Sequence, residues 1–174
     1  TNAYPITGLP EGFKVIGRGY VGVIPVPVII MAVCYAAGII CLKYVKFGRN
    51  MFAIGGNQDA AKLSGITVKK NKIAIFTLCG VTAAISGIIL SSRLFSGQPN
   101  SGSSFTMDAI ASCVIGGTST TGGKGRLWGT FIGALIIGII DNGMTLLGIS
   151  TNWQYIVKGA IIIIAVGLDS IREK

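Results

Sequence analysis

Histidine is absent from this sequence of 174 residues, and charged residues make up only 12% of it. The lack of histidine removes the commonest metal ligand and general base. A soluble domain averages about 25% charged residues, so half that share indicates that a lipid bilayer is the main solvent. The four cysteines lie in apolar runs and form no CxxC pair, a distribution typical of small packing residues.

Acidic residues are also scarce, six against fifteen Lys and Arg, which gives a formal net charge of +9. A charge of that size can indicate nucleic-acid binding. However, the sequence has no RNP-like motif and no basic stripe interleaved with aromatic residues. We therefore expect no nucleic-acid partner, and the basic residues need another explanation.

Apolar runs are what the sequence has in abundance, with 51% of its residues in the hydrophobic class. Residues 21–42 carry no charge, and as a helix they would span about 33 Å, enough for a hydrocarbon core of about 30 Å. Within the run 129–149, Gly129 and Gly133 form a GxxxG pair, which favours close helix packing. Further membrane segments are predicted at 73–92, 129–149 and 153–168.

Residues 107–121 form a fifth, shorter segment. As a helix they would reach only about 22 Å, short of a full span, and they include Asp108 and the pair Gly116-Gly117. A short or broken helix beside a polar cavity fits, because irregular backbone at membrane depth is tolerated only there or inside protein. The predicted fold is therefore all-α, a polytopic transmembrane helical bundle with about five membrane segments, one of them short or broken.

The basic residues fall mainly on one of the two alternating sets of connections that five segments create. The set with the 43–72 loop, the 122–128 turn and the C-terminal tail contains eleven Lys and Arg residues, and the other set contains three. Lys and Arg are enriched in cytoplasmic connections. The 43–72 loop and the C-terminus are therefore predicted to be cytoplasmic, and residues 1–20 form an external loop. A re-entrant 107–121 would place the basic tail outside, which the same rule disfavours.

A short helix is predicted within the 43–72 loop. Asn57 can cap its first turn, which contains Asp59, and Gly65 supplies a left-handed stop. A helix of roughly 11 Å is not stable alone, so it must pack on something. It could pack on the ends of its own membrane neighbours, or it could insert into a groove on a partner protein.

The glycine-rich stretch before residue 129 does not fit a nucleotide-binding P-loop. If Lys124 were the P-loop lysine, the first glycine of the motif would fall on Thr118. Gly125 also stands where Ser or Thr must hold magnesium. We therefore expect no cofactor in this chain.

The loop helix and the residues after it resemble a known motif. Asp59-Ala60-Ala61, Gly65 after three residues and Ile75 after nine more resemble the EAA loop of ABC-importer permeases. Asp59 stands where Glu is usual, and Phe76-Thr77-Leu78 replaces the x-Leu-Pro that ends the motif. Both departures are expected for the branch that this sequence resembles, the monosaccharide (ribose/galactose/xylose-type) permeases. The same resemblance extends over the stretches 47–66, 107–143 and 153–170.

The resemblance implies a multi-pass permease of the bacterial plasma membrane, paired with a second permease chain as a homo- or heterodimer. The sequence begins without Met, and we expect it to be the C-terminal part of a protein with an N-terminal group of helices. The implied partners are an ATP-binding subunit inside, an extracytoplasmic sugar-binding protein outside, and membrane lipid. ATP and Mg²⁺ would belong to the ATP-binding subunit, so the chain itself is not expected to be an enzyme.

By the same resemblance, the 57–65 helix would be the coupling helix that docks on the ATP-binding subunit. ATP-driven closure of that subunit would push on this helix and reorient the membrane helices. The residues carried over to this role are Asn57, Asp59, Ala60, Ala61, Lys62 and Gly65.

Four charges remain at membrane depth or at its edge: Asp108, Asp141, Lys158 and Asp169. A central charge costs about 2.5–3.5 kcal/mol, so each of them needs a partner or water. All but Asp141 lie near segment ends, from which they could extend to the interface. Asp141 is mid-segment and is expected to face the bundle interior or the translocation pathway. The candidate pathway residues are Asp141, Asn142, Thr118 and Ser119.

Two other classes of protein remain as alternatives. A motor-independent secondary transporter or channel would have coupling acids or a filter-like ring and would not need a docking helix. A proton relay would show several acids and often a histidine. A purely structural membrane anchor would not need a capped helix in its loop.

Overall fold

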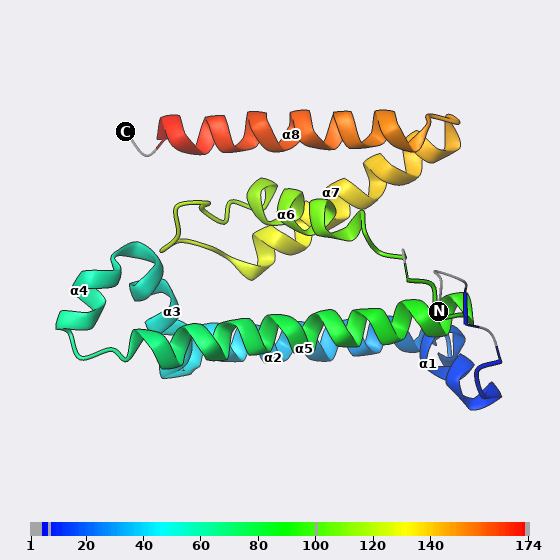
Figure 1. Ribbon diagram of the computed structural model, residues 1–174, viewed down its shortest axis with the longest axis horizontal. Coiled ribbons are helices and arrows are strands. Elements are labelled where there is room, and N and C mark those ends of the chain that lie inside the picture. Colours follow the sequence, from blue (N-terminus) through cyan, green and yellow to red (C-terminus); the bar gives the residue numbers. More distant parts are fainter. Residues whose placement is uncertain (1–4, 7, 100, 173–174) are drawn as a thin grey trace. The chain divides into compact units, whose positions relative to one another are not determined.

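A computed structural model describes residues 5–6, 8–99 and 101–172, with the side chains of those up to residue 167. The described chain is mainly helical (Figure 1). Its helices are the 3-10 turn η1 (Glu11–Phe13), α1 (Lys14–Arg18), α2 (Val26–Tyr44), α3 (Lys46–Gly56), α4 (Gln58–Leu63), α5 (Val68–Leu94), α6 (Phe105–Ile115), α7 (Leu127–Leu146) and α8 (Thr151–Arg172). The strands β1 (Tyr20–Val21) and β2 (Ile24–Pro25) form a small antiparallel hairpin.

Three of the described helices, α2, α5 and α7, are long and apolar enough to cross a membrane, and α6 is a shorter apolar helix. The large side chains of α2 and α5 are mostly exposed, for example Val33 at 63% and Phe76 at 74%. Such exposure would be unfavourable in water and is expected in lipid. The predicted all-α transmembrane fold is confirmed.

The structure differs from the predicted segments mainly at their ends. Helix α2 begins at Val26 and not at residue 21, because Tyr20–Pro25 forms the hairpin and Pro25 precedes the first helical turn. Helix α5 begins at Val68, so its first turns carry three lysines ahead of the apolar run. The 43–72 loop also contains α3, an amphipathic helix that was not predicted.

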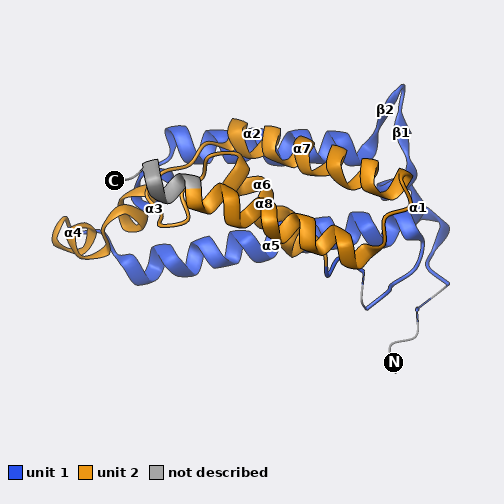
Figure 2. Cartoon of the chain, turned by 90° about the horizontal axis from the view of Figure 1, so that it is seen from above, with its two compact units in different colours: residues 1–51, 65–103 blue, residues 52–64, 104–174 orange. Residues whose placement is uncertain are grey.

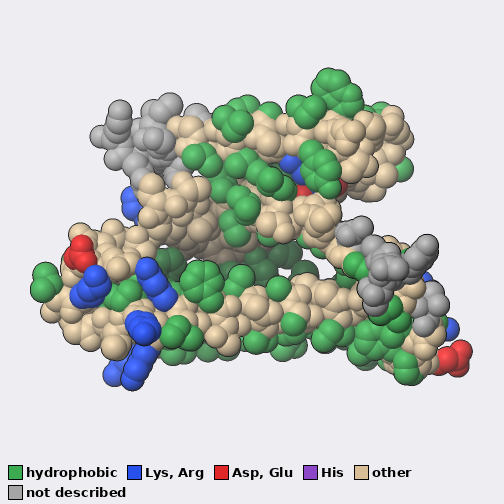
Figure 3. Space-filling view, in the orientation of Figure 1, with side chains coloured by type: hydrophobic (Ala, Val, Ile, Leu, Met, Phe, Trp, Pro, Cys, Tyr) green, Lys and Arg blue, Asp and Glu red, His purple; other side chains and the backbone are tan. Residues whose placement is uncertain are grey.

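The described chain divides into two compact units, coloured separately in Figure 2. Unit 1 comprises Thr1–Met51 and Gly65–Ser103, and in it α2 and α5 run in opposite directions (Figure 1). Helix α1 contacts both α2 and α5. On the visible face of unit 1, hydrophobic side chains cover the long helices and basic ones gather where α5 begins (Figure 3).

Unit 2 comprises Phe52–Ser64 and Ser104–Lys174, so it joins α4 to α6, α7 and α8. Helix α6 packs on both α7 and α8. The predicted GxxxG pair lies at the α6–α7 contact, because a Cβ atom on Gly129 or Gly133 would collide with the backbone of α6 and its C-terminal cap. The role predicted for that pair in close helix packing is confirmed.

Candidate functional site

Helix α4 begins with the predicted cap. The Asn57 side-chain oxygen Oδ1 accepts hydrogen bonds from the backbone N–H groups of Asp59 at 3.0 Å and Ala60 at 2.9 Å. These bonds satisfy two donors that a helix start otherwise leaves free. After the helix, Gly65 has φ +79°, the left-handed conformation expected for a stop. The local geometry predicted for this segment is therefore confirmed.

The two faces of α4 differ sharply. Ala61 is 4% exposed, so it packs inside unit 2, whereas Leu63 is 90% exposed. Lys62 forms an ion pair with Asp59 at 3.0 Å, and both side chains are largely exposed, so this pair adds little stability. The outward face of α4 thus presents Asp59, Lys62 and one large apolar side chain, Leu63.

Leu63 is the residue of this segment that the sequence prediction missed, while Ala61 was included among the docking residues. In a helix of six residues the hydrophobic periodicity is too short to show which side faces inward. The available signal was that Leu63 is the only large apolar residue between Asn57 and Gly65.

The end of helix α3, which precedes α4, is joined to the turn between α6 and α7 by a contact between glycines. A Cβ atom on Gly55 would lie 2.7 Å from the backbone nitrogen of Gly123, and one on Gly123 would lie 2.8 Å from the Cα atom of Gly56. The contact is between backbones, so neither side can yield by rotating a side chain. The end of α3 is therefore tied directly to the α6–α7 turn within unit 2, and only Asn57 separates it from the start of α4.

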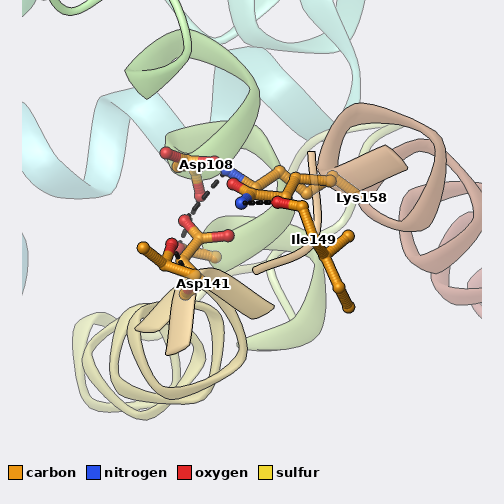
Figure 4. Close-up of polar contacts among 7 residues, drawn as sticks. Asp108, Asp141, Ile149 and Lys158 are labelled. Atoms are coloured by element: carbon orange, nitrogen blue, oxygen red, sulfur yellow. Dashed lines mark hydrogen bonds and ion pairs between the residues drawn. The ribbon is translucent and has the colours of Figure 1, made fainter. Parts of the chain in front are cut away.

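A cluster of three charges around the buried Lys158 connects the helices of unit 2 (Figure 4). Lys158 in α8 extends its ammonium nitrogen Nζ to Asp108 Oδ1 in α6, at 2.5 Å, and to Asp141 Oδ2 in α7, at 2.9 Å. The Lys158 side chain is 5% exposed, that of Asp108 18% and that of Asp141 28%. We call these residues the charge cluster.

The charge cluster balances only one of its two carboxylates. Two acidic side chains and one basic side chain give it a formal charge of −1. The second oxygen of Asp141, Oδ1, is buried and has no hydrogen-bond partner within the described part of the chain. One lysine therefore holds two helices to a third, and its removal would leave both acids without their cation.

The sequence prediction treated these charges one by one. Asp141 was expected to face the bundle interior, and it does lie toward α6 and α8. Asp108 and Lys158 were expected to extend toward the interface, and here the prediction is wrong, because Lys158 forms ion pairs with both Asp108 and Asp141. The signal was present, since all three lie in segments predicted to cross the same membrane. Asp169 lies outside the described side chains.

Of the other candidate pathway residues, Asn142 follows Asp141 in α7, whereas Thr118 and Ser119 lie in the turn after α6. Thr118 Oγ1 lies 3.4 Å from Thr130 Oγ1, and Ser119 Oγ lies 2.8 Å from Thr121 Oγ1. These contacts are in the turn after α6, about 15 Å farther along the chain than Asp108 at 1.5 Å per helical residue. Within the described residues, no group of three His, Cys, Asp or Glu side chains is placed to hold a metal ion.

Comparison with known proteins relates the sequence of this chain to membrane permeases. Residues 3–166 match the family described as "Branched-chain amino acid transport system / permease component". The chain is 50% identical over 171 residues to the ribose import permease protein RbsC of Bacillus subtilis (strain 168). The matched region covers 97% of this chain and 53% of that protein. No solved structure matches it significantly.

Two further relatives are similar. The chain is 52% identical over 151 residues to the xylose transport system permease protein XylH of Haemophilus influenzae, covering 87% of this chain and 40% of that protein. It is 45% identical over 177 residues to RbsC of Escherichia coli (strain K12), covering 99% of this chain and 55% of that protein. The chain thus spans about half the length of the curated relatives that it matches.

Proposed function

The chain belongs to the family described as branched-chain amino acid transport system / permease component, and we propose from this that it is the permease subunit of an ATP-driven monosaccharide importer. It is a multi-pass membrane protein, in line with its apolar helices. The observation that carries the proposal is the identity of 45–52% to permeases named for ribose and xylose. The names of these relatives support a pentose as the substrate, although the family description names branched-chain amino acids.

The substrate is tested by uptake. The full permease is reconstituted into vesicles with its ATP-binding subunit and its extracytoplasmic binding protein, and labelled ribose, xylose and leucine are offered. We expect ATP-dependent accumulation of a pentose and none of leucine. Accumulation of leucine alone would overturn the sugar assignment but leave the family intact. Pentose uptake that persists without ATP would favour a motor-independent secondary transporter.

For the mechanism, we propose that α4 docks on the ATP-binding subunit. Its outward face carries Leu63, an apolar side chain 90% exposed, next to the exposed Asp59–Lys62 pair. An apolar anchor with charged neighbours is typical of the centre and rim of a protein interface. The cap at Asn57 supports this role, because it holds a short helix in shape before any partner is bound.

We propose that a push on α4 is passed to α6 and α7 through the glycine contact. Gly55, at the end of α3, and Gly123 meet backbone to backbone. Only Asn57 separates α3 from α4, so a displacement of α4 would reach a contact that side chains cannot absorb. The charge cluster would then carry α8 along with α6 and α7. In this scheme the chain performs no covalent chemistry, and ATP with Mg²⁺ is bound and hydrolysed on the partner subunit.

The docking proposal is tested by capture of the ATP-binding subunit on immobilised permease. Leu63→Glu is the test variant, and Lys69→Gln on α5 is the matched control, since both make the net charge more negative by one at an exposed position. We expect capture to fall at least tenfold with Leu63→Glu and to stay unchanged with Lys69→Gln. Ala61 is unsuitable for this test, because its burial means that a large substitution would disturb unit 2 itself. Full capture by Leu63→Glu would refute docking through this face.

A further inference from the structure

A pair of arginines is held together where α1 meets the end of α5 in unit 1. Gly17 of α1 lies against the backbone of α5, because a Cβ atom on Gly17 would be 2.5 Å from the backbone nitrogen of Arg93. The Gly17 N–H donates to Ser92 Oγ at 2.7 Å, and that hydroxyl donates to the Phe13 carbonyl. Arg18 Nε then donates to the carbonyl of Arg93 at 2.8 Å. These contacts fix Arg18 beside the last turn of α5.

Both arginines line one cavity of about 610 Å³ that lies entirely within unit 1. Tyr20, in the first strand of the hairpin, stands at the same cavity and is 70% exposed. The rest of the lining comes mainly from apolar side chains at the start of α2 and near the end of α5. These side chains are Pro25, Pro27, Val28 and Ile89.

No acidic side chain in the described part of the chain forms an ion pair with Arg18 or Arg93. Arg18 and Arg93 line the same cavity, and an anion bound there would lower the repulsion between two cations. A guanidinium group presents parallel N–H donors that match the oxygens of a phosphate. The cavity thus combines a cationic rim that suits phosphate with an apolar wall that does not suit a small soluble anion.

The position of the cavity identifies the source of the phosphate. It lies where α2 begins, at Val26, and where α5 ends, at Leu94, and both helices are long enough to cross a membrane. The ends of such helices lie at the level of the lipid headgroups. We propose that this cavity binds one anionic phospholipid, with its phosphate on Arg18 and Arg93 and an acyl chain along the apolar wall.

A defined site differs from the general tendency of arginines to extend toward headgroups. A free arginine at a helix end reaches the interface without selecting a lipid. Here Arg18 is held by its own hydrogen bond, α1 is fixed by Ser92, and a cavity is already formed. The proposal therefore predicts both selectivity for lipid charge and dependence on these two side chains.

The test is lipid retention by the full permease purified in detergent, followed by native mass spectrometry. Phosphatidylglycerol is the probe, phosphatidylcholine with the same acyl chains is the neutral control, and glycerol 3-phosphate is the free headgroup. We expect phosphatidylglycerol to be retained at least about tenfold more strongly than phosphatidylcholine, and Arg93→Gln to reduce this preference about tenfold. Arg18→Gln should act in the same direction.

Lys14→Gln is the matched control. Lys14 lies on the same short helix and carries the same charge, but it stacks on the Phe95 ring at 4.3 Å and does not line the cavity. Its replacement should leave the preference unchanged, and unaltered thermal unfolding of each variant excludes loss of fold. The Arg93 side chain makes no hydrogen bond within the described residues, so its replacement should not disturb the fold. If Arg18→Gln fails to fold, Arg93→Gln alone therefore decides the test. Equal retention of both lipids, an equal loss in Lys14→Gln, or full competition by glycerol 3-phosphate would overturn the proposal.

Discussion

Replacement of Lys158 by methionine is the most informative perturbation of the membrane helices. The change keeps the apolar stem of the side chain but removes the cation that pairs with Asp108 at 2.5 Å and with Asp141 at 2.9 Å. Breaking a buried ion pair by removing one partner costs about 3–5 kcal/mol, because the remaining charge is left uncompensated. We expect Lys158→Met to lower the free energy of unfolding by about 3 kcal/mol.

Removal of one acid should cost much less. The charge cluster carries a formal charge of −1, so Asp141→Asn leaves a balanced pair of Lys158 and Asp108. The Asp108 side chain is also the less exposed of the two acids, 18% against 28%. We expect Asp141→Asn to cost about 1 kcal/mol, the typical net value of a hydrogen bond. The lysine variant should therefore be clearly less stable than the Asp141 variant.

The triple variant Lys158→Met, Asp108→Asn, Asp141→Asn separates the ion pairs from simple packing. Replacing a whole buried set of charges is often close to neutral, so the triple variant should recover most of the stability that Lys158→Met loses. The measurement is the free energy of unfolding of the full permease in mixed micelles titrated with a denaturing detergent. A triple variant as unstable as the single one, or a Lys158→Met variant within about 0.5 kcal/mol of wild type, would refute the reasoning.

Three further predictions concern the glycine contact between α3 and the α6–α7 turn, the cap of α4, and the packing of α1. Gly123→Ala should reduce the sugar transported per ATP hydrolysed while the ATP-binding subunit is still captured, and Gly148→Ala, which has a similar positive φ but open space around it, controls for backbone strain. Asn57→Ala should destabilise α4 by about 0.5–2 kcal/mol, measured as faster hydrogen exchange of the two amides that it caps; unchanged exchange would contradict the cap. Gly17→Ala should lower the thermal midpoint of the permease, because its methyl group would meet the backbone nitrogen of Arg93 at 2.5 Å; an unchanged midpoint would show that α1 is not held there.

The membrane segments and the cap of α4 could be predicted because their signals are local. A long uncharged run sets the depth at which the chain lies, and an Asn followed by Asp two residues later sets a helix start. Hydropathy does not set where a helix ends, so Val68–Leu94 extends beyond the apolar run into its lysines. Residues 21–25 were predicted to be part of a membrane span because they are uncharged, although they belong to the Tyr20–Pro25 hairpin.

The charge cluster could not be read with the same certainty, because its members are separated by 33 and 17 residues in sequence. Taken alone, Asp108 and Lys158 could extend to the interface, and Asp141 could face the bundle interior. Only the proximity of the three side chains in the structure shows that they pair with one another. The inward face of Ala61 and the outward face of Leu63 depend likewise on packing of α4 within unit 2. Sequence reasoning thus located both sites but assigned the partners of their side chains incompletely.

Photo-crosslinking from α4 tests the central proposal most directly. A photoreactive amino acid is placed at Leu63 of the full permease, and as a control at Val33, which is 63% exposed on the apolar helix α2. In assembled transporters that remain active, we expect Leu63 to give an adduct with the ATP-binding subunit and Val33 to give none. An active, assembled transporter with no such adduct from Leu63 would contradict docking through α4.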